Sequence, residues 1–244
     1  MKDNFSKQSD RYARYRPQYP QDLFGYLQSL VSPHDTAWDC ATGNGQIALG
    51  LAQFFKQVHA TDISQNQLNH AAQAPNITYG IAPAEHPPFA DQSMNLVTVA
   101  QAIHWFDFDA FYAAVRRVLR PGGLLAVIGY GNAEIDETID AIVHRFYTGP
   151  VDPYWDPERA YVDDHYRNIP FPFEALETPV FEIQHLWTRQ QFMGYVGTWS
   201  AVQHYKDEHG EDPTPVLEQA LLPVWPDGKH LPVHFPMFLR LARL

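Results

Sequence analysis

The stretch Asp39-Cys-Ala-Thr-Gly-Asn-Gly45 joins a short apolar segment, residues 36–40, to residues 46–55, whose apolar positions have helical spacing. Small residues let the backbone turn tightly and let a ligand approach the main chain, and glycines also accept positive φ. The start of the following helix offers backbone N–H groups to a carboxylate. The stretch therefore predicts a strand, a tight turn and a helix, with a ligand site at the turn.

A second acidic residue, Asp62, directly follows the next predicted strand, residues 57–61. An acid at this position is placed to accept hydrogen bonds from both ribose hydroxyls of a nucleoside. A dinucleotide site would place Gly-x-Gly-x-x-Gly at the turn, whereas here the carboxylate of Asp39 precedes the turn. That carboxylate would repel a pyrophosphate, but it suits the cationic amino group of a methionyl moiety. The pattern therefore favours S-adenosylmethionine over NAD.

Strand and helix patterns alternate along the first half of the chain. Further strands are predicted at residues 76–81, 94–100 and 124–130, and helices at 20–31, 64–74 (with Ser64 as the N-cap) and around 111–119, before Pro121-Gly-Gly123. This alternation implies parallel strands with helices on both faces of the sheet. It predicts a doubly wound, Rossmann-like α/β core over residues 33–131, with the ligand site beyond the carboxyl ends of the strands.

After residue 131 the pattern is weaker. Residues 149–177 are rich in proline and aromatic residues, and helices are predicted at 132–147, 189–205 and 213–222, with strands at 180–187 and 233–243. We therefore predict one α/β domain with a mostly parallel seven-stranded sheet. Residues 1–32 form an arm and a helix, and residues 132–244 form a lid and the final two strands.

The composition of the chain limits the kinds of partner that it is expected to bind. The net charge of −11 argues against a nucleic-acid partner, because binding to DNA or RNA depends on neutralising phosphates. No apolar run approaches the ~20 residues that span a bilayer, the first residues do not resemble a signal peptide, and the chain has one cysteine. These features predict a cytoplasmic protein with no membrane partner. No metal site is expected, since the one histidine pair at i, i+4, His230 and His234, has a proline between its members and no accompanying carboxylate. Monomer and homodimer both remain open.

Several motifs, in the same order, resemble those of class I S-adenosylmethionine-dependent methyltransferases of the type 11 group, and most of all the trans-aconitate methyltransferase-like branch. The first is Asp39–Gly45, with Ala41 where glycine is commoner. The others are Asp62-Ile63, Ala84-Glu85 with Pro87-Pro-Phe-Ala-Asp91, Gln101–Asp107, Leu119–Gly123 and the amino-terminal Tyr12-x-x-x-Arg16-Pro17-x-Tyr19-Pro20. The resemblance covers residues ~5–130; beyond them, Thr198-Trp-Ser200 resembles a substrate-side element of that branch.

The resemblance implies roles for individual residues. His104 and Trp105 would line the acceptor pocket next to the reacting methyl, and His104 is a weaker candidate for a general base. Trp187, Trp199 and Trp225 are further candidates for the acceptor pocket, although aromatic packing of the lid explains them at least equally well. The cofactor-binding residues would be Tyr12, Arg16, Asp39, Ala41, Gly43, Gly45, Asp62, Ile63, Ala84, Glu85 and Gln101.

The function expected from these features is methyl transfer from S-adenosylmethionine to a small-molecule acceptor, with a carboxylic acid as the candidate acceptor. A carboxylate is nucleophilic at neutral pH, so catalysis would rest on positioning and on exclusion of water. Arg16 could then anchor the acidic acceptor. Two alternatives stay open: a non-catalytic protein that binds S-adenosylmethionine, and an NAD-dependent oxidoreductase.

Overall fold

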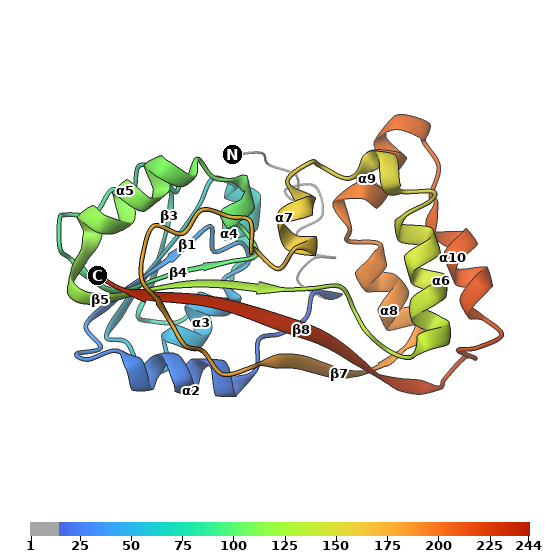
Figure 1. The fold of residues 1–244 in the computed structure, drawn as a ribbon, viewed down its shortest axis with the longest axis horizontal. Helices are drawn as coiled ribbons and strands as arrows, with labels where there is room; N and C mark the ends of the chain where they lie inside the picture. The colour runs from blue at the N-terminus through green and yellow to red at the C-terminus, as the bar shows by residue number, and fades with distance from the viewer. Residues whose placement is uncertain (1–14) are drawn as a thin grey trace.

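The computed structural model describes residues 15–244. Five parallel strands form the centre of one sheet in the order β3-β2-β1-β4-β5 (Figure 1). Strand β8 lies antiparallel to β5 and closes the sheet on that side, together with β6. The strands are β1 Thr36–Cys40, β2 Gln57–Asp62, β3 Ile77–Ile81, β4 Met94–Ala100, β5 Leu119–Tyr130, β6 Ala175–Leu176, β7 Glu182–Thr188 and β8 His230–Arg243.

Helices cover both faces of this sheet because its central strands are apolar on both sides. Alternate residues along a strand enter different cores: Ala37 packs on the side of α2 (Gln21–Leu30) and α3 (Gln46–Leu51), and Trp38 packs on the side of α5 (Phe108–Val118). Helix α4 (Gln65–Asn69) connects β2 to β3. The doubly wound α/β core predicted from the sequence is confirmed.

The strand count differs from the prediction of seven. The described part of the chain forms eight strands, because β6 is added to the seven that were predicted. Strand β8 is long enough to pair with two main partners. Its residues 230–236 pair with β7, and its residues 237–243 pair with β5. The extra strand, β6, has only two residues and lies in the proline-rich segment that shows no sequence periodicity.

Three predicted helices are shorter in the structure. The side chain of Ser64 caps α4 by accepting a hydrogen bond from the Gln67 N–H, but the helix ends at Asn69, and the Ala72 N–H then bonds to the Asn44 carbonyl. The segment predicted as one helix at 189–205 forms α8 (Arg189–Val196) and α9 (Ser200–His209), separated by the extended backbone of Trp199. The helix predicted at 46–55 ends at Leu51.

The late helices form a second layer beside the carboxyl ends of the parallel strands, at the right of Figure 1. Here α10 (Thr214–Leu221) contacts both α6 (Glu137–Tyr147) and α8, and α9 contacts the 3-10 turn η3 (Asp152–Tyr154). Helix α7 (Arg159–Asp163) lies between this layer and the sheet. Among residues 15–244 no helix is both long and apolar enough to cross a membrane.

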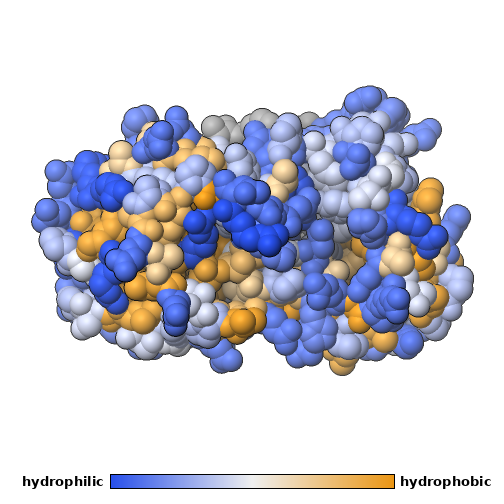
Figure 2. All heavy atoms as spheres, viewed as in Figure 1, coloured by the Kyte–Doolittle hydropathy of each residue, from blue (hydrophilic) through white to orange (hydrophobic). Residues whose placement is uncertain are grey.

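The segment 170–181 crosses the sheet end of the molecule, where β6 pairs with β8. Apolar residues gather at the surface of this end, whereas hydrophilic residues dominate the middle of the same face (Figure 2). The carboxyl ends of β1, β2 and β4 point away from this surface, toward the late helices.

Candidate functional site

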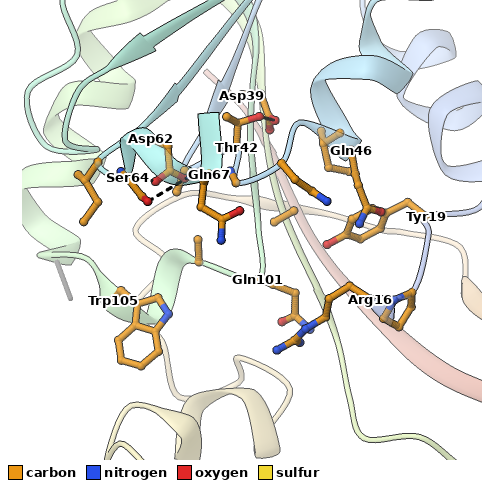
Figure 3. Close-up of a pocket in the computed structure, with 18 of the residues that line it drawn as sticks. Arg16, Tyr19, Asp39, Thr42, Gln46, Asp62, Ser64, Gln67, Gln101 and Trp105 are labelled. Carbon is orange, nitrogen blue, oxygen red and sulfur yellow. Dashed lines mark hydrogen bonds between the residues drawn. The ribbon is translucent and has the colours of Figure 1, made fainter. Parts of the chain in front are cut away.

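A cavity lies at the carboxyl ends of β1, β2 and β4, where the strand order reverses at β1 (Figure 3). Its volume is about 830 Å³, including the space at its open mouth. Three loops build most of its wall, because each follows one of these strands. We call it the first cavity; its lining is Arg16, Pro17, Tyr19, Asp39, Ala41, Thr42, Gly43, Asn44, Gln46, Ile47, Asp62, Ile63, Ser64, Gln67, Ala100, Gln101, Ala102, Trp105 and Tyr130.

The turn after β1 has the backbone that its sequence predicts. Gly43 and Gly45 have φ of 55° and 81°, and Ala41 adopts 52°, a conformation that side chains rarely take. Gln101, the residue that follows β4, has the same φ of 52°. Strained backbone of this kind clusters at ligand sites, and here it occurs at the carboxyl ends of two adjacent strands.

Asp39 is buried at the floor of this cavity, with 1% of its surface exposed. Its Oδ1 accepts a hydrogen bond from Thr98 at 2.7 Å, and its Oδ2 accepts one from Thr42 at 2.5 Å. Burial raises the pKa of Asp39 to about 6, against the opposing effect of these two hydrogen bonds. A cation placed beside this carboxylate would restore its charge, so the site suits a cationic group.

Asp62 is positioned by backbone hydrogen bonds. Its Oδ2 accepts from the Gly43 N–H and its Oδ1 from the Ser64 N–H, each at 2.9 Å. These bonds tie the end of β2 to the turn after β1 and hold the carboxylate at the cavity wall. A carboxylate oxygen can accept more than one hydrogen bond, so an acid at this position suits a ligand that carries a pair of hydroxyl groups.

Two buried side-chain oxygens in the wall have no donor. Gln101 Nε2 donates to the Tyr130 carbonyl at 2.8 Å, which fixes the amide and leaves its Oε1 without a partner among residues 15–244. The Oε1 of Gln46 is buried and likewise has none there. Buried polar atoms are nearly always hydrogen-bonded. The wall therefore fits a ligand rich in N–H and O–H donors, as a nucleoside with an amino-acid arm is.

Arg16 joins the core to the late helices. Its Nη1 donates to the Tyr130 hydroxyl and its Nη2 to the Thr198 carbonyl, each at 3.3 Å. Its side chain points into the first cavity beside Gln101 (Figure 3). The other amino-terminal candidate, Tyr12, lies outside the described residues.

A second cavity of about 490 Å³, again including its mouth, adjoins the first. Arg16, Gln101 and Trp105 line both cavities, so the two meet at these side chains. The remaining wall comes mostly from the late segments: His104, Trp155, Asp156, Arg159, Val162, Trp199 and Ser200. In residues 15–244 no group of three or more His, Cys, Asp or Glu side chains is arranged to hold a metal ion.

His104 lines only the second cavity and is 8% exposed. Its ring packs on Trp105, and its Nδ1 lies 2.9 Å from the Tyr166 hydroxyl. Burial, and to a lesser degree the charge of Arg159, lower the pKa of His104 to about 3. The imidazole is therefore uncharged at neutral pH and is a weak base.

The structure does not bring three of the predicted residues to a cavity wall. Gly45 lies behind the wall, where it allows the turn and a close approach of the Tyr79 hydroxyl. Ala84 is packed in the core on the α5 side, at 2% exposure. Glu85 Oε1 accepts from the Asp107 N–H at 3.2 Å and so stabilises the loop before α5.

Several wall residues were missed by the sequence analysis. Gln46 and Gln67 lie in the first turns of predicted helices, and a glutamine there is not distinguished by sequence from a surface residue. Trp155 and Arg159 lie in the segment without periodicity, so only tertiary packing reveals them. Trp199 does line the second cavity, whereas Trp225 is fully buried in the core.

Comparison with known proteins identifies the family. A protein-family model described as a methyltransferase domain matches residues 38–127 of this chain. A Dictyostelium discoideum protein that carries a methyltransferase name is 32% identical over 249 residues, spanning 99% of this chain and 95% of that protein. A solved structure from Anaeromyxobacter dehalogenans, described as a type II methyltransferase, is 42% identical with a TM-score of 0.86, covering 94% of this chain and 98% of its own. The match to a methyltransferase-named protein of Mycobacterium tuberculosis is 33% identical and covers 52% of each chain.

The chain therefore belongs to the class I S-adenosylmethionine-dependent methyltransferases, a family of enzymes whose methyl donor is S-adenosylmethionine. This membership confirms the class that the motifs suggest. It sets aside the two alternatives, the NAD-dependent oxidoreductase and the non-catalytic binding protein.

Proposed function

We propose that this methyltransferase transfers the methyl group to a carboxylate oxygen of a small acid bound in the second cavity, like the trans-aconitate methyltransferase-like branch that its motifs resemble. The observation that carries the proposal is the junction of the two cavities at Arg16, Gln101 and Trp105. A donor in the first cavity and an acceptor in the second would meet there.

The first cavity would hold S-adenosylmethionine through residues with distinct tasks. Asp39 would face the cationic amino group, and the Asp62 carboxylate, held at the wall by the Gly43 and Ser64 N–H groups, would accept hydrogen bonds from the ribose hydroxyls. The unpartnered oxygens of Gln46 and Gln101 would accept further N–H or O–H donors. Arg16, Ala41, Gly43 and Ile63 complete this part of the wall. When bound, the cofactor supplies an electrophilic methyl group.

The protein's own residues would then act by positioning. Two guanidinium groups, Arg16 and Arg159, line the second cavity against one carboxylate, Asp156, and His104 is uncharged, so the cavity attracts anions. The rings of Trp105, Trp155 and Trp199 exclude water from the acceptor. A carboxylate needs no proton removed, which agrees with the low basicity of His104.

The test is a screen of small acids with labelled S-adenosylmethionine and the full chain. We expect a product heavier by one methylene and cleaved by mild alkali, as a methyl ester is. Amine or phenol acceptors offered alongside serve as the contrast. Transfer to nitrogen or phenol oxygen, with no acid methylated, would disprove carboxylate methylation.

A further inference from the structure

Arg159 has a setting that the function proposed above does not explain. It is the first residue of α7 and lines the second cavity, but it is absent from the wall of the first. Arg16, in contrast, stands at the junction of the two. A group bound by Arg159 therefore lies in the second cavity and not in the first.

The guanidinium of Arg159 is held from outside this cavity. Its Nε donates to the Tyr147 hydroxyl at 2.8 Å and to Asp163 Oδ1 at 3.0 Å, and one Nη2 hydrogen goes to Asn132 Oδ1 at 2.6 Å. Tyr147, Asp163 and Asn132 all line a different cavity, and none of them lines the second. Three hydrogen bonds thus fix the planar guanidinium group, which we call the fork, before an acceptor binds.

The donors left over can serve a ligand. A guanidinium has five N–H groups, and the structure gives partners to Nε and Nη2; no residue among 15–244 accepts a hydrogen bond from Nη1. A planar fork with open donors matches the two oxygens of a carboxylate. The Asp163 carboxylate is not used by Arg159 alone. The Tyr147 hydroxyl donates to both of its oxygens, at 2.9 and 2.8 Å, so Asp163 is shared between Tyr147 and Arg159.

Aromatic rings surround the fork. The guanidinium carbon lies 4.9 Å from the ring centre of Trp155, and Trp155 lies 5.6 Å, centre to centre, from Trp199. Both tryptophans line the second cavity together with Arg159 and Trp105. Flat, apolar walls of this kind suit a flat, apolar ligand body.

We propose that Arg159 binds a second, non-reacting carboxylate of the acceptor, so that the preferred acceptor is a dicarboxylic acid with a flat body lying against Trp155 and Trp199. This inference rests on the proposed function, because the first carboxylate is the one that receives the methyl group. Arg159 is then a specificity-determining residue that contacts the acceptor but not the reacting atoms. Asp156, which lines the same cavity, disfavours an anion at its own position and so directs the second carboxylate to Arg159.

The experiment compares dicarboxylates with their monoamides: terephthalate, isophthalate and glutarate, each against the compound in which one carboxylate is an amide. The full chain is assayed as wild type, Arg159→Met, Arg159→Lys and the control Arg145→Met, whose arginine is exposed on α6. We expect the wild type to prefer at least one dicarboxylate over its amide by roughly 10- to 100-fold in kcat/KM, mainly through KM, as for a charge-assisted hydrogen-bonded pair.

The variants separate a specific role from a structural one. Arg159→Met should lower kcat/KM for the dicarboxylate much more than for its amide, so that the preference disappears, whereas general damage to the fold would lower both rates equally. Arg159→Lys keeps the charge without the fork and should show an intermediate preference. Arg145→Met should behave as the wild type.

Binding is measured in parallel by calorimetry, with S-adenosylhomocysteine present. If the wild type binds no dicarboxylate more tightly than its amide, or if Arg159→Met keeps the preference, the role of Arg159 is disproved, although monoacids may still be methylated. If dicarboxylates bind through Arg159 but no acid is methylated, carboxylate methylation fails and the Arg159 site stands.

Discussion

The two cavities are built in different ways. The first is formed by backbone: three strand ends, a turn with φ values of 52°, 55° and 81°, and a carboxylate held by two main-chain N–H groups. The second is formed by side chains from late segments far apart in the sequence, with Arg159 held by Tyr147, Asp163 and Asn132. Backbone geometry suits a ligand common to a family, whereas side chains on late helices can change without altering the sheet.

This contrast predicts that changes in the first cavity alter cofactor affinity, and that changes in the second alter acceptor use. The Arg159 variants should accordingly leave the affinity for S-adenosylmethionine unchanged. The expected effects below run from the largest to the smallest.

Asp62→Ala should weaken the binding of S-adenosylmethionine by roughly 100-fold, because it removes acceptors for two hydroxyl groups and the brace to Gly43. Calorimetry on the purified chain measures this. Asp109→Ala, which removes an exposed acid on α5, is the matched control. Unchanged affinity in Asp62→Ala would rule out the ribose role.

Gly45→Ala should lower the free energy of unfolding by about 2 kcal/mol, since a side chain at positive φ is strained and its Cβ would meet the Tyr79 hydroxyl. Gly122→Ala is the control: its φ is 79°, but nothing lies within 4 Å of the added Cβ. Urea denaturation of both variants isolates the contact with Tyr79. Equal losses in the two would show that this contact contributes nothing.

Cofactor affinity should depend on pH through Asp39. Its pKa in the folded protein, about 6, lies above the ordinary value of 3.8. Protonation of Asp39 therefore stabilises the unliganded fold below pH 3.8, and this contribution is lost as the pH rises through 6. A cationic ligand favours the ionised form, so affinity should be about tenfold weaker at pH 5 than at pH 7.

Asp39→Asn should remove this pH dependence and bind the cofactor weakly at both values. Titration calorimetry at the two pH values, in buffers of different ionisation enthalpy, also counts the proton released. Wild-type affinity that is the same at both pH values would contradict the role of Asp39.

His104→Gln should change kcat by no more than about threefold, and the pH profile of the wild type should show no limb near 6.5, because an imidazole with a pKa of about 3 does not act as the base. Single-turnover rates from pH 5 to 9 measure both. A limb near 6.5 that disappears in His104→Gln would restore the catalytic role.

The sequence predicts the lining residues of the first cavity better than those of the second. Asp39, Ala41, Gly43, Asp62 and Ile63 were all predicted at the cofactor site, and all line the first cavity. They are predictable because strand ends and tight turns follow from local composition.

The prediction of individual site residues is weaker in the loop that follows β3. Ala84 and Glu85 belong to a recognisable motif, but the structure packs the first in the core and bonds the second to the Asp107 N–H. The break between α8 and α9 at Trp199 was also not predicted, although Gly197 and Thr198, two poor helix formers, directly precede it.

The sequence by itself determined the α/β core, the turn after β1 and the acid after β2, because these depend on contacts between neighbours in the chain. Only the tertiary structure decided that Trp155, Arg159 and Trp199 meet Arg16, Gln101 and Trp105 around one cavity. These residues are brought together by packing over long stretches of chain, and no periodic pattern records such contacts. The strained turn that begins at Asp39 is therefore readable as a cofactor site, and the acceptor site becomes visible only in the folded protein.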